Sequence, residues 1–456
     1  MVRCAAGGGD RISLIPMRLL PRVVFLIAFL SFAAAAIAET PERPALRIPP
    51  GAHAGPGFDA TTATNAWLAT FAGEKRARSD AYFEGGYWLM LWDFLYSAAV
   101  FVLLLVSGLS ARMRDLAERV TRFRPLQTFL YWAQFLTAMW VCSLPLSIYE
   151  GYWRERQYGL TNQSFAAWFG DGLKSLAIGA VLGGLMIMAL FGVVRRLPRT
   201  WHVWGAIVAM IMIAFSMLIG PVFIAPMFNR YTPLEDPKIV APILALARAN
   251  GIPVTRIYQV DASRQSNRVS ANVTGFLGTQ RITLNDNLLN RCSPEEILSV
   301  MGHEMGHYVL GHVYKGLLFL LVVTTVFFVL LRQALEWSLA RWGGKWRIGA
   351  VGDVAIAPLA AFWLSLFAFV FMPIQNSFVR GQEYEADLYG INAARQPDGE
   401  AQVDVLLGEY RKLSPTPLEE FLFYDHPSGR TRIYAAMRWK AENQCLAEPG
   451  SAGCGK

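Results

Sequence analysis

Six apolar stretches of about 20 residues run through this sequence of 456 residues. They cover approximately residues 87–109, 128–149, 173–194, 201–224, 315–335 and 354–374. A helix of about 20 apolar residues crosses the hydrocarbon core of a bilayer with all its backbone polar groups bonded internally. The hydrophobic content of 54% is also above that of an ordinary soluble domain. The sequence therefore predicts an α-helical multi-span membrane protein.

The N-terminal region differs from the rest of the chain. Residues 1–38 contain Arg11, Arg18 and Arg22, then an apolar run over 23–35, then Ala36-Ile37-Ala38. This pattern is typical of a secretory signal with an A-x-A cleavage site, and an uncleaved first membrane span fits it equally. Residues 39–86 are rich in Pro, Gly, Ala and Thr and show little apolar periodicity, so we expect a loosely ordered polar segment there.

A polar segment of residues 229–313 follows the four spans within 87–228. A helix is predicted over 237–250, and short strands over 254–260 and 281–284. Ser293 then precedes Pro294, with Glu296 three residues after the serine. This order is the signature of a helix start, with the serine as N-cap and the glutamate completing a capping box.

That helix carries His303-Glu304-Met305-Gly306-His307, an HExxH motif. Residues four apart lie on one face of a helix, so both imidazoles can bind one metal ion. Glu304 lies alongside them, where it can take a proton from the attacking water. The motif by itself also fits a helix with ordinary histidines.

The distribution of histidine strengthens the metal interpretation. The chain has six histidines, and four of them, His303, His307, His312 and His426, lie in the candidate catalytic half. His312 is a poor third ligand, because on a continuous helix it falls on the other side from His303. We expect it to make a polar contact near the bilayer edge.

A third ligand is expected after the last span, in Gln382-Glu383-Tyr384-Glu385-Ala386-Asp387. Glu383 and Asp387 share a helix face one turn apart, so Glu383 can bind the metal while Asp387 orients a histidine ligand. A solvated acidic helix explains the same spacing, and the residues alone leave both interpretations open.

Several motifs together resemble the type I CAAX prenyl proteases, which are integral-membrane gluzincins with seven spans. They are HEMGHYVLGH at 303–312, RGQEYEAD at 380–387 and DHPSGRTRI at 425–433, with Tyr149-Glu150-Gly151-Tyr152 and Ile224-Ala225-Pro226-Met227-Phe228 after two earlier spans. The resemblance extends from about Phe83 to the C-terminus. It implies one zinc ion per chain, with Glu383 and not Glu385 as its third ligand.

The resemblance also implies a substrate site. His426 takes the position of a histidine beside the substrate, where it can stabilise an oxyanion, and Arg432 takes that of an arginine six residues later. An edge strand that pairs with the substrate backbone corresponds to Ser270, Ala271 and Asn272. Ser270 stands where the family usually has asparagine. Asn272 can replace that side chain only if the strand is regular.

The fold predicted from these features is a membrane helix bundle with a water-accessible cavity and a zincin-like α+β catalytic domain, built on the HExxH helix and short edge strands. Two further spans within 314–374 lead to a C-terminal catalytic segment, 375–456, which holds the third ligand and the His-Pro element. Asp93 and Lys174 lie in or beside spans, where charges normally face protein or water, and are candidates to line the cavity.

The predicted function is zinc-dependent hydrolysis of peptide bonds with Glu304 as general base. The partners are a peptide or protein substrate and the lipid bilayer. The net charge of +8 lies mostly in short loops beside spans, so nucleic-acid binding is not predicted. The alternative is a transporter or channel with a structural zinc site, but structural zinc needs no glutamate after its first histidine.

The signal-like N-terminus and compact loops indicate a bacterial chain, in which membrane or envelope proteins are the expected substrates. Twelve basic residues follow the first, third and fifth spans and indicate that these loops are cytoplasmic. The zinc site then faces the periplasm, whereas the eukaryotic family is usually described with its catalytic side toward the cytosol. A periplasmic C-terminus would permit a disulfide between Cys445 and Cys454, and two unpaired cysteines are the alternative.

Overall fold

The computed structural model of the chain describes residues 43–274 and 280–448. The chain divides into two compact units, residues 1–42 and 43–456, and only the second contains described residues. The predicted signal or first span and Cys454 lie outside them.

Six helical stretches among the described residues are long and apolar enough to cross a membrane, which confirms the multi-span prediction. The first four are α3 (Glu74–Val106); α5 (Arg124–Ile148) with η2 (Tyr149–Arg154) and α6 (Glu155–Gln157); α7 (Phe165–Ile178) with η3 (Gly179–Gly183) and α8 (Gly184–Arg196); and α9 (Trp201–Ile219) with η4 (Gly220–Ile224) and η5 (Ala225–Met227). The last two are α13 (His312–Trp346) and η7 (Val354–Ile356) with α14 (Ala357–Ala394). Five of them contain a predicted apolar stretch, whereas α3 ends at Val106, three residues before the end of the predicted stretch 87–109; α3 begins and α14 ends well beyond the predicted limits.

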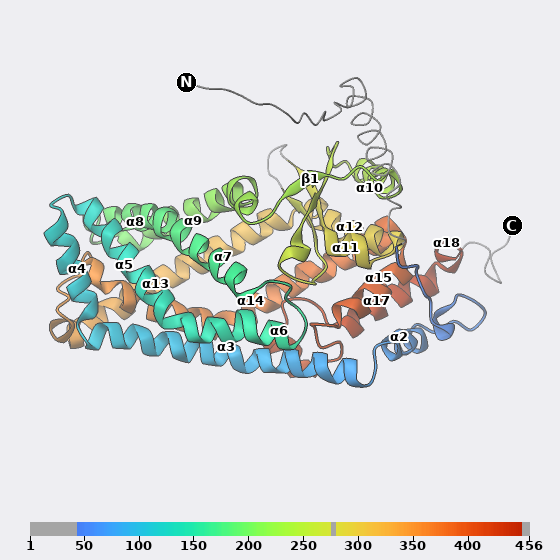
Figure 1. Cartoon of the computed structure of the whole chain (residues 1–456), viewed down its shortest axis with the longest axis horizontal. Helices are drawn as coiled ribbons and strands as arrows, with labels where there is room; N and C mark the ends of the chain where they lie inside the picture. The colour runs from blue at the N-terminus through green and yellow to red at the C-terminus, as the bar shows by residue number, and fades with distance from the viewer. Residues whose placement is uncertain (1–42, 275–279, 449–456) are drawn as a thin grey trace, which may run out of the picture. The chain divides into compact units, whose positions relative to one another are not determined.

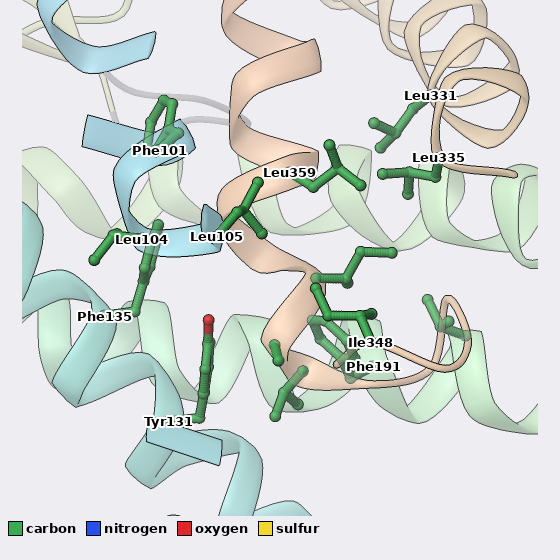
Figure 2. Close-up of a cluster of buried hydrophobic side chains, with 14 of the residues drawn as sticks. Phe101, Leu104, Leu105, Tyr131, Phe135, Phe191, Leu331, Leu335, Ile348 and Leu359 are labelled. Atoms are coloured by element: carbon green, nitrogen blue, oxygen red, sulfur yellow. The ribbon is translucent and has the colours of Figure 1, made fainter. Parts of the chain in front are cut away.

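The membrane helices share a buried apolar core at the end of the bundle where α4 (Leu109–Val120) lies (Figures 1 and 2). Its side chains come from α3, α5, α8, α13 and α14, and they include Phe101, Leu105, Phe135, Phe191, Leu331 and Leu359. Tyr131 is buried among them, and its hydroxyl lies 2.6 Å from that of Ser110, which in turn donates to the Ala355 carbonyl at 2.7 Å. This core therefore packs together helices that are far apart in the sequence.

The described residues of the polar segment form a small mixed sheet, three α-helices and one short 3-10 helix. Its elements are β1 (Tyr231–Pro233), α10 (Pro237–Ala249), β2 (Ile257–Val260), η6 (Ala262–Arg264), β3 (Ala271–Thr274), β4 (Arg281–Asn285), α11 (Asp286–Arg291) and α12 (Pro294–Val309). The strand order is β1-β2-β4-β3, with β2 and β4 parallel and the outer strands antiparallel to their neighbours. β3 is therefore an edge strand, as an α+β catalytic domain with short edge strands predicts.

The start of α12 follows the predicted signals. The Ser293 side chain accepts a hydrogen bond from the Glu296 backbone, and the Glu296 side chain accepts one from the Ser293 backbone, so the capping box is present with Pro294 in the first turn. The helix ends at Val309, because Gly311 adopts a left-handed conformation with φ 67° before α13 begins at His312. The prediction that His303 and His312 lie on one continuous helix is therefore wrong.

Residues 43–86 also differ from the expected loosely ordered segment. They contain η1 (Pro50–Ala52), α2 (Ala60–Ala69) and the first turns of α3. Trp67, Leu68 and Phe71 are buried against the C-terminal helix α17 (Gly429–Glu442). A ten-residue helix with so few large apolar side chains gives little periodic signal, so its stability depends on this tertiary contact.

The remaining C-terminal helices are α15 (Pro397–Leu407), α16 (Pro417–Phe423) and α18 (Gln444–Ala447). A cavity of about 600 Å³ lies between α3, η2 and the loop before β3, and its lining includes the charged residues Asp93, Glu150, Arg154 and Arg268. Asp93 lines this cavity, but none of the predicted zinc-site residues does, so its role in a cavity at the active site stays a prediction. Lys174 is not part of the lining, because its ammonium pairs instead with Asp171 on its own helix at 3.1 Å.

Candidate active site

The helix with the HExxH motif crosses α14 at unusually close range. A Cβ atom at Gly302 would lie 2.9 Å from the Gly390 carbonyl oxygen, and one at Gly390 would lie 2.6 Å from the His303 backbone nitrogen. Gly306 similarly faces the Ala386 backbone at 3.1 Å. Small residues at four-residue spacing on both helices thus bring the backbones together, and the segment 383–387 reaches the histidines.

Three predicted ligands converge at this crossing. Ligand atoms of His303, His307 and Glu383 all lie within 4.8 Å of one another. The two Nε2 atoms are 3.1 Å apart, and the carboxylate oxygens of Glu383 lie 3.3 Å from His303 Nε2 and 3.5 Å from His307 Nε2. Two helices therefore present two imidazoles and one carboxylate to a common point.

The donor set fits a metal ion. His303 Nδ1 lies 2.7 Å from Asp387 Oδ1, and because a carboxylate only accepts, Nδ1 carries the proton and Nε2 keeps a lone pair. Oε2 of Glu383 is buried and accepts no well-formed hydrogen bond from the described residues, although two imidazole nitrogens lie 3.3 Å away. A cation at the common point would satisfy these facing lone pairs.

Asp387, the residue expected to orient a histidine ligand, is held by Arg432 of α17. The guanidinium donates to both carboxylate oxygens of Asp387, at 3.0 and 2.6 Å. Both side chains are buried, and a bidentate pair of this kind fixes the plane of the carboxylate.

Arg432 has two further acidic partners that the sequence analysis did not identify. Its nitrogens lie 3.1 Å from Glu400 Oε1 and 2.9 Å from Asp404 Oδ1, both on α15. Burial raises the pKa of Asp404 well above its usual range, and the Glu400 and Asp387 charges add to that, while Arg432 opposes it. The sequence signal for this cluster was the pair Glu400 and Asp404, which lie four residues apart on one face of a buried helix. The spacing does not reveal their partner, because Arg432 is distant in sequence.

Glu304 lies close to the same cluster. Burial raises its pKa above that of an ordinary glutamate, while His303 and His307 and a hydrogen bond from the Val273 backbone lower it. A carboxylate with a raised pKa accepts a proton more readily, which suits a general base. The contact with Val273 also places Glu304 beside the edge strand β3.

His426 enters the cluster from the loop between α16 and α17. Its Nε2 lies 3.3 Å from Glu383 Oε2, and its Nδ1 lies 2.8 Å from Asp425 Oδ1. The structure thus brings His426 to the predicted ligands. Its Nδ1 faces the Asp425 carboxylate, and its Nε2 is the nitrogen directed toward Glu383.

The candidate substrate residues lie on and before β3. Ala271 and Asn272 pair with Leu284 and Thr283 of β4 in a regular antiparallel register, and the Ser270 carbonyl accepts from the Asn285 N–H at 3.0 Å. Asn272 is exposed while Ala271 is buried, as in a regular strand. This is the condition under which the Asn272 side chain could serve in place of the family's asparagine at position 270.

His312 is placed differently from expectation. It is buried, and its Nδ1 lies 2.8 Å from His307 Nδ1. The polar contact is therefore with a predicted ligand, although His312 does not face the common point itself.

Two family models match adjoining parts of the chain. Residues 64–230 match the model described as CAAX prenyl protease N-terminal, five membrane helices, and residues 233–440 match Peptidase family M48. The junction coincides with the passage from the fourth span to the sheet.

Similar proteins include a metalloprotease of Bacillus subtilis, the uncharacterized YhfN, which is 30% identical over 74% of this chain and 80% of its own. CAAX prenyl protease 1 of Saccharomyces cerevisiae is 29% identical over 64% of this chain and 68% of its own. The crystal structure of S. mikatae Ste24p has the same fold, with a TM-score of 0.63 and 22% identity over 94% of this chain and 100% of that one. This chain therefore belongs to peptidase family M48 and is a membrane metalloprotease similar to the CAAX prenyl proteases.

Proposed function

We propose that this chain is a zinc-dependent endopeptidase of the bacterial inner membrane, which cleaves membrane or envelope proteins at a site facing the periplasm. The convergence of His303, His307 and Glu383 within 4.8 Å is the observation that carries the proposal. Two imidazoles and a carboxylate, with a further position left for water or substrate, form the donor set of known zinc peptidases. We therefore assign these three residues to one zinc ion per chain.

The protein's own groups supply the proton transfers. Zinc, when bound, would polarise the scissile carbonyl and make water more acidic. Glu304 takes a proton from the attacking water and later gives it to the leaving amine. His426 donates a hydrogen bond from Nε2 to the oxyanion that develops on the carbonyl oxygen. Because its Nδ1 already donates to Asp425, this requires the ring in its imidazolium form. Asp387, held by Arg432, keeps the His303 ring in place throughout.

The substrate binds as an extended strand along β3. This strand is at the sheet edge, and Glu304 contacts the Val273 backbone on it, so a peptide paired there would pass beside the base. Relatives are named CAAX prenyl proteases, but a Bacillus relative shows that the family extends to bacteria. Membrane and envelope proteins are the broader substrate class that fits such a host. The alternative function, a transporter or channel with structural zinc, gains no support from the family.

The test combines metal analysis with a peptidase assay on the full-length protein in detergent. Wild type should contain one zinc per chain and cleave a fluorogenic peptide. Glu304→Gln should retain the zinc and lose activity by about 10²–10⁴-fold, because the attacking water loses its proton acceptor. Glu295→Gln makes the same chemical change earlier on α12 and should stay active. Zinc-free activity, or an active Glu304→Gln protein, would refute the proposal.

A further inference from the structure

The two candidate histidine ligands are supported in different ways. His303 Nδ1 meets the carboxylate of Asp387 directly. His307 Nδ1 meets a second imidazole, that of His312, at 2.8 Å, and the rings stand nearly perpendicular at an interplanar angle of 72°. His312 Nε2 in turn lies 3.2 Å from Glu385 Oε2. His307, His312 and Glu385 thus form a chain of two hydrogen bonds that leads away from the metal site.

The break between α12 and α13 makes this chain possible. On a continuous helix, residues five apart are separated by about 140° and do not face each other. Gly311 adopts a left-handed backbone conformation that ends α12, and His312 becomes the first residue of α13. The turn directs the His312 side chain back toward His307 and buries it, with 4% of the side chain exposed.

The chemistry of the end group fixes the direction of both hydrogen bonds. Glu385 is a carboxylate and only accepts, and the Lys315 ammonium at 2.7 Å favours its charged form. The donor in that pair is therefore His312 Nε2, so a neutral His312 has its lone pair on Nδ1. His307 Nδ1 must then be the donor to His312, which leaves the lone pair of His307 on Nε2. That nitrogen is the one that lies 3.5 Å from Glu383.

We infer that His312 and Glu385 are positioning residues for His307, which select the tautomer and hold the ring so that Nε2 faces the metal. The inference rests on the proposed zinc site and extends it to residues that touch neither metal nor substrate. Partners of this kind typically change metal affinity by about 10–100-fold when they are removed. The effect passes through His307 alone, because His303 has its own support in Asp387 and Arg432.

The experiment compares two substitutions of His312 in the full-length protein in detergent. His312→Leu removes the acceptor for His307 Nδ1, and zinc affinity, measured by competition with a chelating dye, should fall by about 10–100-fold. His312→Asn keeps an acceptor oxygen near the position of Nδ1 and should recover most of the affinity. The visible spectrum of cobalt-substituted protein should change in His312→Leu and resemble wild type in His312→Asn. The melting temperature of the metal-free protein should be equal in all three.

His202→Leu is the matched control, since it removes a histidine from α9, where the ring contacts Arg332 and no candidate ligand. It should bind zinc as wild type does. Wild-type affinity in His312→Leu would overturn the inference, as would equal losses in the leucine and asparagine variants. If Glu304→Gln is inactive and wild type holds zinc while His312→Leu is unaffected, only this inference fails. If wild type binds no zinc, the proposed function fails and this inference fails with it.

Discussion

At the scale of single residues, Glu383 and Glu385 are two positions apart on α14 and have different surroundings. The Glu383 side chain is 11% exposed and lies against both histidines of the motif. The Glu385 side chain is 53% exposed and pairs with His312 and Lys315. Successive side chains of a helix point about 100° apart, so residues at i and i+2 face different neighbours.

Glu383→Ala should therefore lose zinc far more completely than Glu385→Ala. The first change deletes a ligand, whereas the second removes the end of a hydrogen-bond chain and should weaken affinity by about tenfold. Zinc per chain, measured after equal exposure of both proteins to a chelator, checks this order. The assignment is wrong if Glu385→Ala is the variant that emerges without metal.

The Arg432 guanidinium pairs with three carboxylates, those of Asp387, Glu400 and Asp404. Removing one partner from a buried charge cluster leaves uncompensated buried charge, which typically costs about 3–5 kcal/mol. Arg432→Met should therefore lower the thermal stability of the metal-free protein as well as its zinc affinity. Arg438→Met is the control on the same helix, because its ion pair with Glu442 is exposed and worth at most about 1 kcal/mol. Equal melting temperatures for the two variants would contradict a structural role for the cluster.

The residues of the site differ in how far the sequence can predict them. His303, Glu304 and His307 lie on one turn of helix, so local spacing is enough. Glu383 is 76 residues beyond His307, and its spacing suits a solvated helix equally, so the family resemblance was needed to choose it. Glu400 and Asp404 were missed because their partner Arg432 lies on another helix. A contact between two helices produces no regular spacing of residues that could be recognised in the sequence.

At the scale of elements, the crossing of α12 and α14 sets the distance between the HExxH motif and Glu383. Gly390 has no room for a Cβ atom, since His303 backbone atoms would lie 2.6 and 2.9 Å from it. Backbone cannot give way as the end of a side chain can, so the two helices must separate. This requirement explains why glycine and alanine stand at the contact positions Gly302, Gly306 and Ala386.

Gly390→Ala should consequently impair zinc binding, although it changes no polar group. Forcing a methyl group into a packed contact typically costs about 1–3 kcal/mol, so the melting temperature should fall as well. Gly381→Ala is the matched control on α14, because a Cβ atom there meets nothing within 4 Å. It should keep its zinc, and by helix propensity it should be as stable as wild type or up to about 1 kcal/mol more stable. Wild-type zinc affinity in Gly390→Ala would show that the helices do not need this close contact.

The predictability of the elements follows the strength of their local signals. Spans about 20 residues long were found because the bilayer demands a continuous apolar run. The start of α12 was found because its capping box is local. The end of α12 was not found, since Gly311 is only one glycine in a stretch that otherwise fits a helix. The short helix α2 was missed because its burial depends on α17, more than 350 residues later.

At the scale of the whole molecule, the three basic loops lie together at one end of the helix bundle. Arg114, after the first span, pairs with Asp353 in the loop after the fifth span, and Arg195, after the third span, donates to the Gly352 carbonyl at 3.0 Å. Arg332 of α13 donates to the Arg199 carbonyl at 2.8 Å. Residues Trp67, Leu68 and Phe71, which precede the first span, instead pack against α17 in the C-terminal segment. The six described spans thus separate a basic end from an end that holds both the catalytic segment and the start of α3.

This separation gives a prediction about sidedness. If the basic loops are cytoplasmic, the catalytic segment, residues 43–73 and the C-terminus all face the periplasm. A reporter active only in the periplasm should then work when fused after Lys456 and be inactive when fused after Arg124. Western blots of both fusions should show equal expression, so that inactivity reflects location.

The same orientation places Cys445 and Cys454 where a disulfide can persist, and both should resist thiol labelling until reductant is added. The fusion result has the greater weight, because free thiols would be compatible with either side. An inactive reporter after Lys456 together with an active one after Arg124 would reverse the orientation, and the substrates would then be sought on the cytosolic face of the membrane.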